Sequence, residues 1–344
     1  MTTVNYVNFP GLGIQDLPVD RVAFSIGNLP IYWYGILIAV AVLLSVFLGM
    51  RHAPKYGLTP DDVLDVIIAV IPFAVVFARL YYVVFTWDSF KDDLLKIVDV
   101  RGGGLAFYGG VIGGVLGVLL VARLKRIRLH RLVDFLVVYL PLGQAIGRWG
   151  NFFNQEAFGT NTTLPWGMKS AATQAYLQSI ASSYPGIVPS DPVHPTFLYE
   201  FLANMLIFAA LLAIRRRSKT PYVTTLSYLA MYGFVRFFTE GIRTDSLYAT
   251  VAGLTFRTSQ ILSLVMFVVS VVLLWILRAR AEKRAFQAEF SAGISAPAEG
   301  EGSGEAAPEA PEASAAPEAP VAPAAPEAPE APAAPEEKDG PSGS

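Results

Sequence analysis

The stretch that decides the fold is PIYWYGILIAVAVLLSVFLGM, residues 30–50. It carries no charged residue and is long enough to cross the hydrocarbon core of a bilayer, which takes about 20 apolar residues in a helix. Similar segments recur along the chain, whereas a closed β-barrel would show alternating segments of about ten residues. The sequence therefore predicts an all-α polytopic membrane protein.

We expect seven transmembrane helices, at about 30–50, 63–86, 103–122, 132–147, 196–214, 221–240 and 259–277. The segments that follow the first, third, fifth and seventh spans hold 15 Lys and Arg residues, and the other four segments hold eight. Because cytoplasmic loops are enriched in basic residues, this bias predicts the N-terminus outside and the C-terminus in the cytoplasm. The long segment 148–195 would then form a small extracytoplasmic head.

The composition supports a membrane protein, with 53% hydrophobic residues, 16% charged residues and a mean hydropathy of +0.46. The chain has no cysteine, which excludes disulfides and a thiolate nucleophile of its own. Residues 289–344 carry twelve acidic residues and one lysine, so the rest of the chain is basic and suits anionic lipids rather than nucleic acid. We divide the chain into a membrane domain, 1–285, and a disordered Ala/Pro/Glu-rich cytoplasmic tail, 286–344.

Polar residues cluster where the fourth span ends, in GRWGNFFNQE, residues 147–156. Arg148, Asn151 and Asn154 are three residues apart and can share one helix face. One interpretation is an interfacial anchor, with the arginine extending to lipid headgroups. However, Gly150 and Gly159 indicate close backbone approach, which an anchor does not require.

A second polar stripe lies on the sixth span, in YGFVRFFTEGIR, residues 232–243. Tyr232, Arg236 and Glu240 are spaced by four residues and therefore lie on one face of a helix. Either the Arg–Glu pair satisfies itself within the bundle, or it serves a site. In both cases the stripe must face protein or water rather than lipid.

Two further motifs contain polar residues near lipid. In RGGGLAFYGGVIGGVLG, residues 101–117, small residues at Gly113, Gly114 and Gly117 favour helix packing. The glycines around Tyr108, at 102–104 and 109–110, favour a broken helix that lines a cavity. In HPTFLYE, residues 194–200, Glu200 lies inside the fifth span, and a lone histidine such as His194 is more often structural than catalytic. Tyr34 and Arg79 are further polar candidates.

No sequence motif for metal or nucleotide binding is present, so we expect no metal and no cofactor. Two intramembrane arginines instead suggest phosphate recognition, because the planar guanidinium binds phosphate through two parallel hydrogen bonds. At that depth the abundant phosphate belongs to an anionic phospholipid. A transporter of anionic solutes or a non-catalytic lipid-binding scaffold would use such arginines too.

The motifs together resemble those of the bacterial prolipoprotein diacylglyceryl transferases. GRWGNFFNQEAFG is similar to the family signature, and WYG, AFYGG, HPTFLYE, YGFVRFFTE and SQILS follow in the family's order over about residues 20–280. The resemblance implies a multi-pass enzyme of the bacterial inner membrane. It implies transfer of sn-1,2-diacylglyceryl from phosphatidylglycerol to the lipobox cysteine of a prolipoprotein. The products would be a thioether and glycerol 1-phosphate, in the first step of lipoprotein maturation.

The resemblance also implies roles for individual residues. The implied catalytic residues are Arg148, Arg236, Tyr108 and Glu240. The implied phosphatidylglycerol contacts are Tyr34, Arg148, Asn151, Asn154, Glu156, Gly159, Tyr232 and Arg236. In this hypothesis the arginines stabilise the leaving phosphate, while Glu240 orients Arg236 and Glu156 orients Arg148 or accepts a proton.

Tyr108 departs from the family pattern, because many members have histidine there. Tyrosine has an unperturbed pKa of about 10 and is a poor base at neutral pH. Either Tyr108 only hydrogen-bonds the lipid, or the base lies elsewhere, or no base is needed.

Overall fold

A computed structural model describes residues 5–99, 103–182, 186–244, 248–251 and 254–295, and residues 1–293 form one compact unit. Its α-helices are α1 (Trp33–His52), α2 (Pro60–Phe85), α3 (Phe107–Leu124), α4 (Leu129–Leu136), α5 (Leu140–Asn154), α6 (Ala171–Ile180), α7 (Thr196–Arg217), α8 (Val223–Ile242) and α9 (Thr258–Ser295). Its strands are β1 (Asn5–Phe9), β2 (Ile14–Val19), β3 (Val22–Ile26), β4 (Leu29–Tyr32), β5 (Lys169–Ser170), β6 (Tyr248–Val251) and β7 (Leu254–Arg257). The chain is mostly helical, as expected.

Among the described residues, six helical segments are long and apolar enough to cross a membrane. They are Trp33–Tyr56, Pro60–Phe85, Phe107–Leu124, Leu129–Asn154, Thr196–Arg217 and Thr258–Arg284. The protein is therefore a multi-pass membrane protein. The predicted sixth span is present as the helix α8, but it is not one of the six, because Arg236, Glu240 and its hydroxyl residues make it less apolar.

The prediction of an all-α chain is wrong for the head. Strand β1 pairs antiparallel with β2 and with β5, and β3 pairs with β4. Proline and glycine punctuate residues 5–32 at short intervals and prevent a helix there. The head is thus built from the N-terminal strands as well as from 148–195. Its core contains the fully buried side chains Val7, Met168, Leu177 and Val193.

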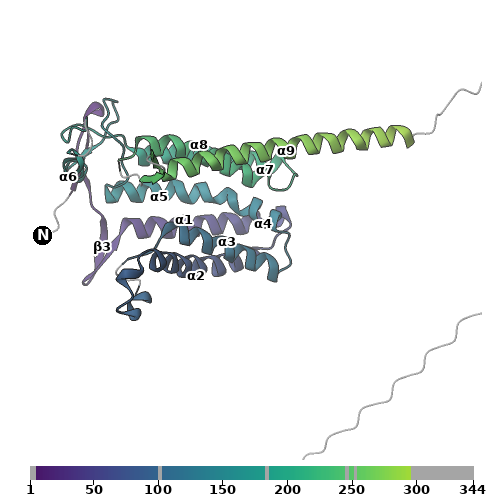
Figure 1. The fold of residues 1–344 in the computed structure, drawn as a ribbon, viewed down its shortest axis with the longest axis horizontal. Coiled ribbons are helices and arrows are strands. Elements are labelled where there is room, and N and C mark those ends of the chain that lie inside the picture. Colours follow the sequence, from purple (N-terminus) through teal and green to yellow (C-terminus); the bar gives the residue numbers. More distant parts are fainter. Residues whose placement is uncertain (1–4, 100–102, 183–185, 245–247, 252–253, 296–344) are drawn as a thin grey trace, which may run out of the picture. The chain divides into compact units, whose positions relative to one another are not determined.

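Helices that pack together run in alternating directions along the bundle (Figure 1). Helix α1 packs on α2 and α5, α2 on α3, and α7 on α5 and α8. As a result the first residues of α1, α3 and α7 and the last residues of α5 and α8 lie at the end of the bundle that carries the head (Figure 1). Because of this alternation, the predicted site residues lie toward the head end of the bundle.

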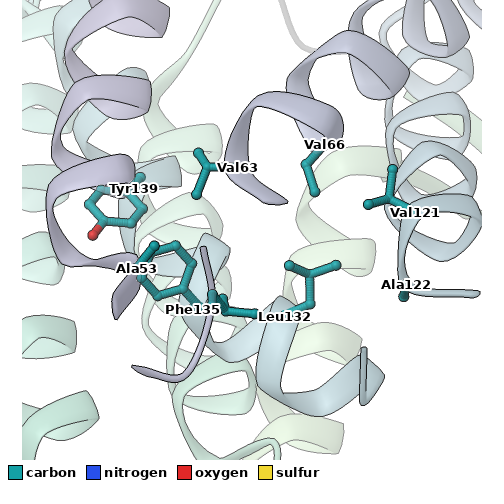
Figure 2. Packing of buried hydrophobic residues seen from close by; sticks show 9 residues of the cluster. Ala53, Val63, Val66, Val121, Ala122, Leu132, Phe135 and Tyr139 are labelled. Atoms are coloured by element: carbon teal, nitrogen blue, oxygen red, sulfur yellow. The ribbon is translucent and has the colours of Figure 1, made fainter. Parts of the chain in front are cut away.

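The other end of the bundle is closed by an apolar cluster (Figure 2). Leu132 and Phe135 of α4 are fully buried against Ala53, Val63 and Val121 from the ends of α1, α2 and α3. The guanidinium of Arg215 lies over the ring of Tyr56 at 4.4 Å and over two further aromatic rings. Arg215, which we counted among the loop cations, is therefore buried in an aromatic cage.

Helices α2 and α3 pack backbone to backbone along a glycine stripe. A Cβ atom added at Gly109, Gly113 or Gly117 would come within 2.9 Å of the α2 backbone. Gly113 and Gly117 therefore serve packing, as predicted, but the same prediction for Gly114 is wrong, because a Cβ there would meet only a Val70 methyl at 3.9 Å. Gly109 lies inside α3 and serves the same purpose, so the prediction that it belongs to a broken helix is wrong.

Helix α9 continues to Ser295, past the start of the tail that we expected at residue 286. The sequence after Trp275 is rich in Ala, Glu, Lys and Arg, which are strong helix formers. Residues 296–344 of the predicted tail lie outside the described residues.

The glycine stripe can be tested with Gly113→Ala. The new methyl group would lie 2.2 Å from the Phe73 carbonyl oxygen, so the helices must separate, and we expect a loss of about 1–3 kcal/mol of stability. The measurement is the thermal unfolding midpoint of the purified protein in detergent. Gly114→Ala is the control, because its nearest neighbour would be a Val70 methyl at 3.9 Å. Equal midpoints for the two variants would contradict the stripe.

Candidate active site

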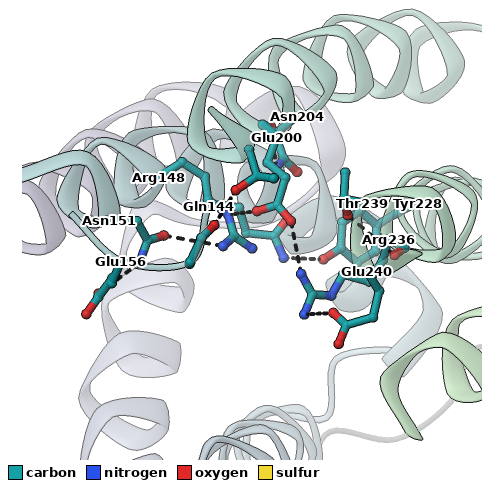
Figure 3. A network of polar contacts seen from close by, with 12 residues as sticks. Gln144, Arg148, Asn151, Glu156, Glu200, Asn204, Tyr228, Arg236, Thr239 and Glu240 are labelled. Atoms are coloured by element: carbon teal, nitrogen blue, oxygen red, sulfur yellow. Dashed lines mark hydrogen bonds and ion pairs between the residues drawn. The ribbon is translucent and has the colours of Figure 1, made fainter. Parts of the chain in front are cut away.

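A connected polar network lies at the head end of the bundle (Figure 3). Arg148 comes from the last two turns of α5, Glu200 from the second turn of α7, and Arg236 and Glu240 from the last two turns of α8. Three helices that are distant in sequence therefore each contribute charged side chains to one place.

Glu200 joins the two arginines. Its Oε1 accepts a hydrogen bond from Arg236 Nη1 at 2.9 Å, and its Oε2 pairs with Arg148 Nε. Only 4% of the Glu200 side chain is exposed, against 19% and 18% for the arginine side chains. One buried carboxylate thus sets the distance and orientation of both guanidiniums.

Arg236 also pairs with Glu240, one turn further along α8, at 2.5 Å from Nη2 to Oε2. The predicted contact between these residues is confirmed, and the helix spacing of four explains it. Arg257, which precedes α9, donates a hydrogen bond to the main-chain oxygen of Glu240. The end of α8 is therefore fixed by the ion pair between Arg236 and Glu240 and by the hydrogen bond from Arg257.

The signature residues of α5 form the other arm of the network. Arg148 Nη1 donates to Asn151 Oδ1 at 3.3 Å, and the amides of Asn151 and Asn154 both donate to Glu156 Oε1, at 3.0 and 3.2 Å. The shared helix face is confirmed. Within the described contacts Glu156 binds the two asparagines and Glu200 binds Arg148, so the prediction that Glu156 orients Arg148 directly is wrong. The alternative, that Glu156 accepts a proton, stays a prediction.

The interpretation of Arg148 as an interfacial anchor is wrong. The guanidinium points into the bundle and is ion-paired there, rather than extended to lipid headgroups. Burying a guanidinium is costly unless a carboxylate compensates it. Two arginines balanced by two buried glutamates meet that condition.

Tyr34 and Gly150 explain how α1 approaches α5. A Cβ atom at Gly150 would lie 2.2 Å from Tyr34 Cδ2, so only glycine lets the ring pack there. Tyr34 and Asn154 also line an open groove of about 610 Å³, together with Arg21 and Tyr32. The groove leads from the first turns of α1 to the asparagine arm of the network.

Gly159 lies where the head contacts the helices that carry the network. Its N–H donates to the His194 carbonyl at 3.0 Å, and the N–H of Thr160 donates to the Ile242 carbonyl at 2.8 Å. A Cβ atom at Gly159 would lie 2.8 Å from His194 Cβ. The close approach predicted for this glycine is confirmed, and it ties the head to the start of α7 and the end of α8.

Three polar residues around the site were not predicted, namely Gln144, Tyr228 and Asn204. Tyr232 stacks on Tyr228 at 5.6 Å, and Tyr228 accepts a hydrogen bond from Gln144. The Asn204 amide donates to the Glu200 main-chain oxygen at 2.7 Å. Gln144 lies four residues before Arg148 and Asn204 four after Glu200, so a search for polar pairs at that spacing would have found them.

Tyr108 lies apart from this network in the described contacts. Its ring faces Tyr81 of α2 at 6.5 Å and Phe107 at 5.9 Å, at the start of α3. The side chain is 37% exposed and therefore accessible to lipid or water. Tyr108 and the two arginines lie at the same end of the bundle, but no described contact joins them.

Arg79 has a structural role. It is buried and donates to the carbonyl oxygens of five loop residues at 2.5–3.0 Å, namely Lys96, Ile97, Asp99, Gly103 and Gly104. All its donors are thus used in fixing the loop between α2 and α3. Within the described residues no group of three His, Asp or Glu side chains is placed to hold a metal ion.

Comparison with known proteins agrees with these motifs. Residues 21–276 match the family model for prolipoprotein diacylglyceryl transferase. The relative from Finegoldia magna, named phosphatidylglycerol–prolipoprotein diacylglyceryl transferase, is 41% identical over 256 residues, which are 74% of this chain and 94% of its own. Relatives of the same name from Clostridioides difficile and Listeria innocua are 39% and 40% identical, over 72% and 77% of this chain and 91% of theirs.

The bridging role of Glu200 predicts a stability difference between two glutamates. Glu200→Gln leaves two largely buried guanidiniums with a neutral partner, so we expect a loss on the order of 3 kcal/mol. Glu156→Gln changes an exposed residue that binds only amides in the described contacts, and we expect a loss below about 1 kcal/mol. Thermal unfolding in detergent compares them, and equal losses would contradict the bridge.

Proposed function

This chain belongs to the prolipoprotein diacylglyceryl transferase family, and from that premise we propose how its polar network acts. The chain is a transferase that moves a diacylglyceryl group from phosphatidylglycerol to a prolipoprotein, the first step of lipoprotein maturation. The transporter and scaffold alternatives are therefore set aside. The observation that carries our proposal is the sharing of Glu200 by Arg148 and Arg236.

The proposed reaction is a displacement at the C3 carbon of the sn-1,2-diacylglyceryl group. The sulfur of the lipobox cysteine forms a bond to C3 while the bond from C3 to the phosphate oxygen breaks. The electron pair leaves with glycerol 1-phosphate, whose negative charge grows as the bond breaks. Because the chain has no cysteine, the thiol must come from the acceptor.

Arg148 and Arg236 would stabilise that growing charge. Each guanidinium carries five N–H groups, and the described contacts use two on each. The described contacts leave the other donors for phosphate oxygens, at guanidiniums that are largely buried, where preorganised donors have a large effect. Glu200 and Glu240 would keep the two guanidiniums in place during the reaction.

The other residues would position the lipid. Asn151 and Asn154, fixed through Glu156, would orient the glycerol hydroxyls, and Tyr34 would border the groove by which the lipid approaches. Gly159 and Tyr232 would shape the wall of the site. Tyr108, at the same end of the bundle, would contact the lipid rather than move a proton.

We also propose that α8 crosses the membrane as a seventh span, with the N-terminus outside and the C-terminus in the cytoplasm of a bacterial inner-membrane protein. Helix α8 has 20 residues and is therefore about 30 Å long. Its charged residues pair within the bundle, which lowers the cost of burying them. The acidic sequence that follows α9 would lie in the cytoplasm.

The phosphate role predicts that Arg148→Lys severely impairs transfer. Lysine keeps the charge but loses the planar pair of donors, so we expect turnover to fall by about 100- to 1000-fold. The assay follows modification of a lipobox peptide, or release of glycerol phosphate, with phosphatidylglycerol as donor. Arg123→Lys, exposed at the opposite end of the bundle, is the control. Near-normal turnover of Arg148→Lys would exclude the paired-donor role.

The orientation can be tested directly because the chain has no native cysteine. Single cysteines are placed at Ser179 in α6 of the head and at Lys219 between α7 and α8, both exposed positions. In intact cells a membrane-impermeant maleimide should label the first variant and leave the second unlabelled until the membrane is opened. The reverse pattern would refute the orientation.

A further inference from the structure

The proposed reaction leaves one proton unassigned, and the inference below rests on that proposed function. The attacking sulfur must be a thiolate, whereas a free cysteine thiol has a pKa of about 8.5. The arginines cannot accept its proton, because a guanidinium stays protonated in proteins. Tyr108 is a poor base and lies apart from the network. A group with an available lone pair at neutral pH is required.

Only one imidazole lies at the head end of the bundle. The whole sequence contains three histidines. His52 is the last residue of α1 and His130 lies in the first turn of α4, so both are at the opposite end. His194 directly precedes Pro195 and the start of α7, at the same end as the arginines.

His194 lines a polar cavity of about 320 Å³ in the head. The other lining residues are Asn161, Thr162, Thr163 and Asp191. A purely structural histidine would be enclosed by packing, but this imidazole borders space that an extended peptide segment can enter. The lining offers hydroxyl, amide and carboxylate groups to the main chain and thiol of such a peptide.

A fixed hydrogen bond orients the imidazole. Its Nδ1 lies 3.1 Å from the Tyr199 hydroxyl, and Trp166 Nε1 donates to the same hydroxyl oxygen at 2.7 Å. In the tautomer that donates Nδ1–H to Tyr199, the lone pair is on Nε2 and can accept a proton. Burial lowers the pKa of His194 below its ordinary value, so the ring is neutral at pH 7.

His194 lies where the head meets the start of α7, the helix that carries Glu200. His194 Cβ packs on Gly159, three residues after the Glu156 carboxylate that binds the asparagine arm. Glu200 follows the start of α7 by four residues, which is about 6 Å along the helix axis. A base at this position requires that the peptide thiol lie between the cavity and the arginines.

We propose that His194 is the general base that accepts the proton of the acceptor's cysteine thiol. The S–H bond breaks with its electron pair left on sulfur, and the proton moves to Nε2. The thiolate then attacks C3, and glycerol phosphate leaves with the electron pair of the C–O bond. The imidazolium returns its proton to water or to the departing phosphate, and the protein is unchanged after each cycle.

The polar and charged residues around His194 come from four segments. Tyr199 of α7 and Asp191 of the preceding loop face the imidazole or its cavity. Arg243 at the end of α8 pairs with Gly159, and Lys169 of β5 follows Met168, which pairs with Val193.

The test is the pH dependence of turnover with a lipobox peptide for His194→Gln. We expect the wild type to lose activity as the pH falls through the pKa of His194, which lies below about 6.5. The variant should lose about 100-fold or more at pH 7. It should then recover about tenfold per pH unit up to about pH 8.5, because the thiol ionises without help there.

Controls separate this inference from the proposed function. A wild-type protein without any transfer activity would refute the proposed function itself. With an active wild type, a His194→Gln variant that is unimpaired, or equally impaired at every pH, would overturn the inference. The same holds if Tyr108→Phe, rather than His194→Gln, removes the acid limb. His130→Gln at the opposite end should behave as wild type.

A measurement on the wild type alone guards against misfolding of the variants. A peptide with selenocysteine in place of cysteine carries a more acidic nucleophile and requires no base. We expect the acid limb seen with the cysteine peptide to disappear with the selenocysteine peptide. An unchanged limb would assign it to another group and overturn the role of His194.

Discussion

One buried carboxylate holds two arginines, and the site depends on that constraint. Glu200 contacts Arg148 of α5 and Arg236 of α8 with its two oxygens, while its own helix, α7, packs against both. At low dielectric a guanidinium without a partner is costly, so the three helices must keep their relative positions. The close contacts at Gly150 and Gly159 serve the same end, because they let α1 and the head approach the network. The same contacts therefore stabilise the fold and position the site residues.

The two ends of the bundle are stabilised in different ways. At the end opposite the head, the apolar cluster around Leu132 and Phe135 closes the helices. The Arg215 guanidinium lies among aromatic rings there and donates to the Phe135 carbonyl and the Tyr139 hydroxyl. At the head end the stabilisation is polar, through the glutamate–arginine pairs and through Arg79, which fixes the loop before α3. This polar end is in contact with the head through Gly159 and Thr160. Its remaining hydrogen-bond donors are the feature that a phosphate group can use.

Contacts within one helix could be predicted from the sequence, and contacts between helices could not. The spacing of Arg148, Asn151 and Asn154 and that of Arg236 and Glu240 gave the correct shared faces, because helix geometry fixes them. Glu200 lies 36 residues from Arg236 in sequence, and no periodicity connects them. We did not predict the strands of residues 5–32, because a search for long apolar spans does not detect short strands in a small head. The polar side chains that indicate a functional role for α8 also lower its hydropathy. For that reason α8 is not among the helices that are apolar enough to cross a membrane.

The most direct test of the arginine pair is a double-mutant cycle on turnover with Arg148→Lys, Arg236→Lys and the double variant. If both arginines act on one phosphate through one bridging carboxylate, each single substitution already disrupts the unit. The account therefore predicts that the double variant is little worse than either single variant, with a large coupling energy between the two positions. Losses that simply add in free energy would show that the arginines act independently, and would contradict the account.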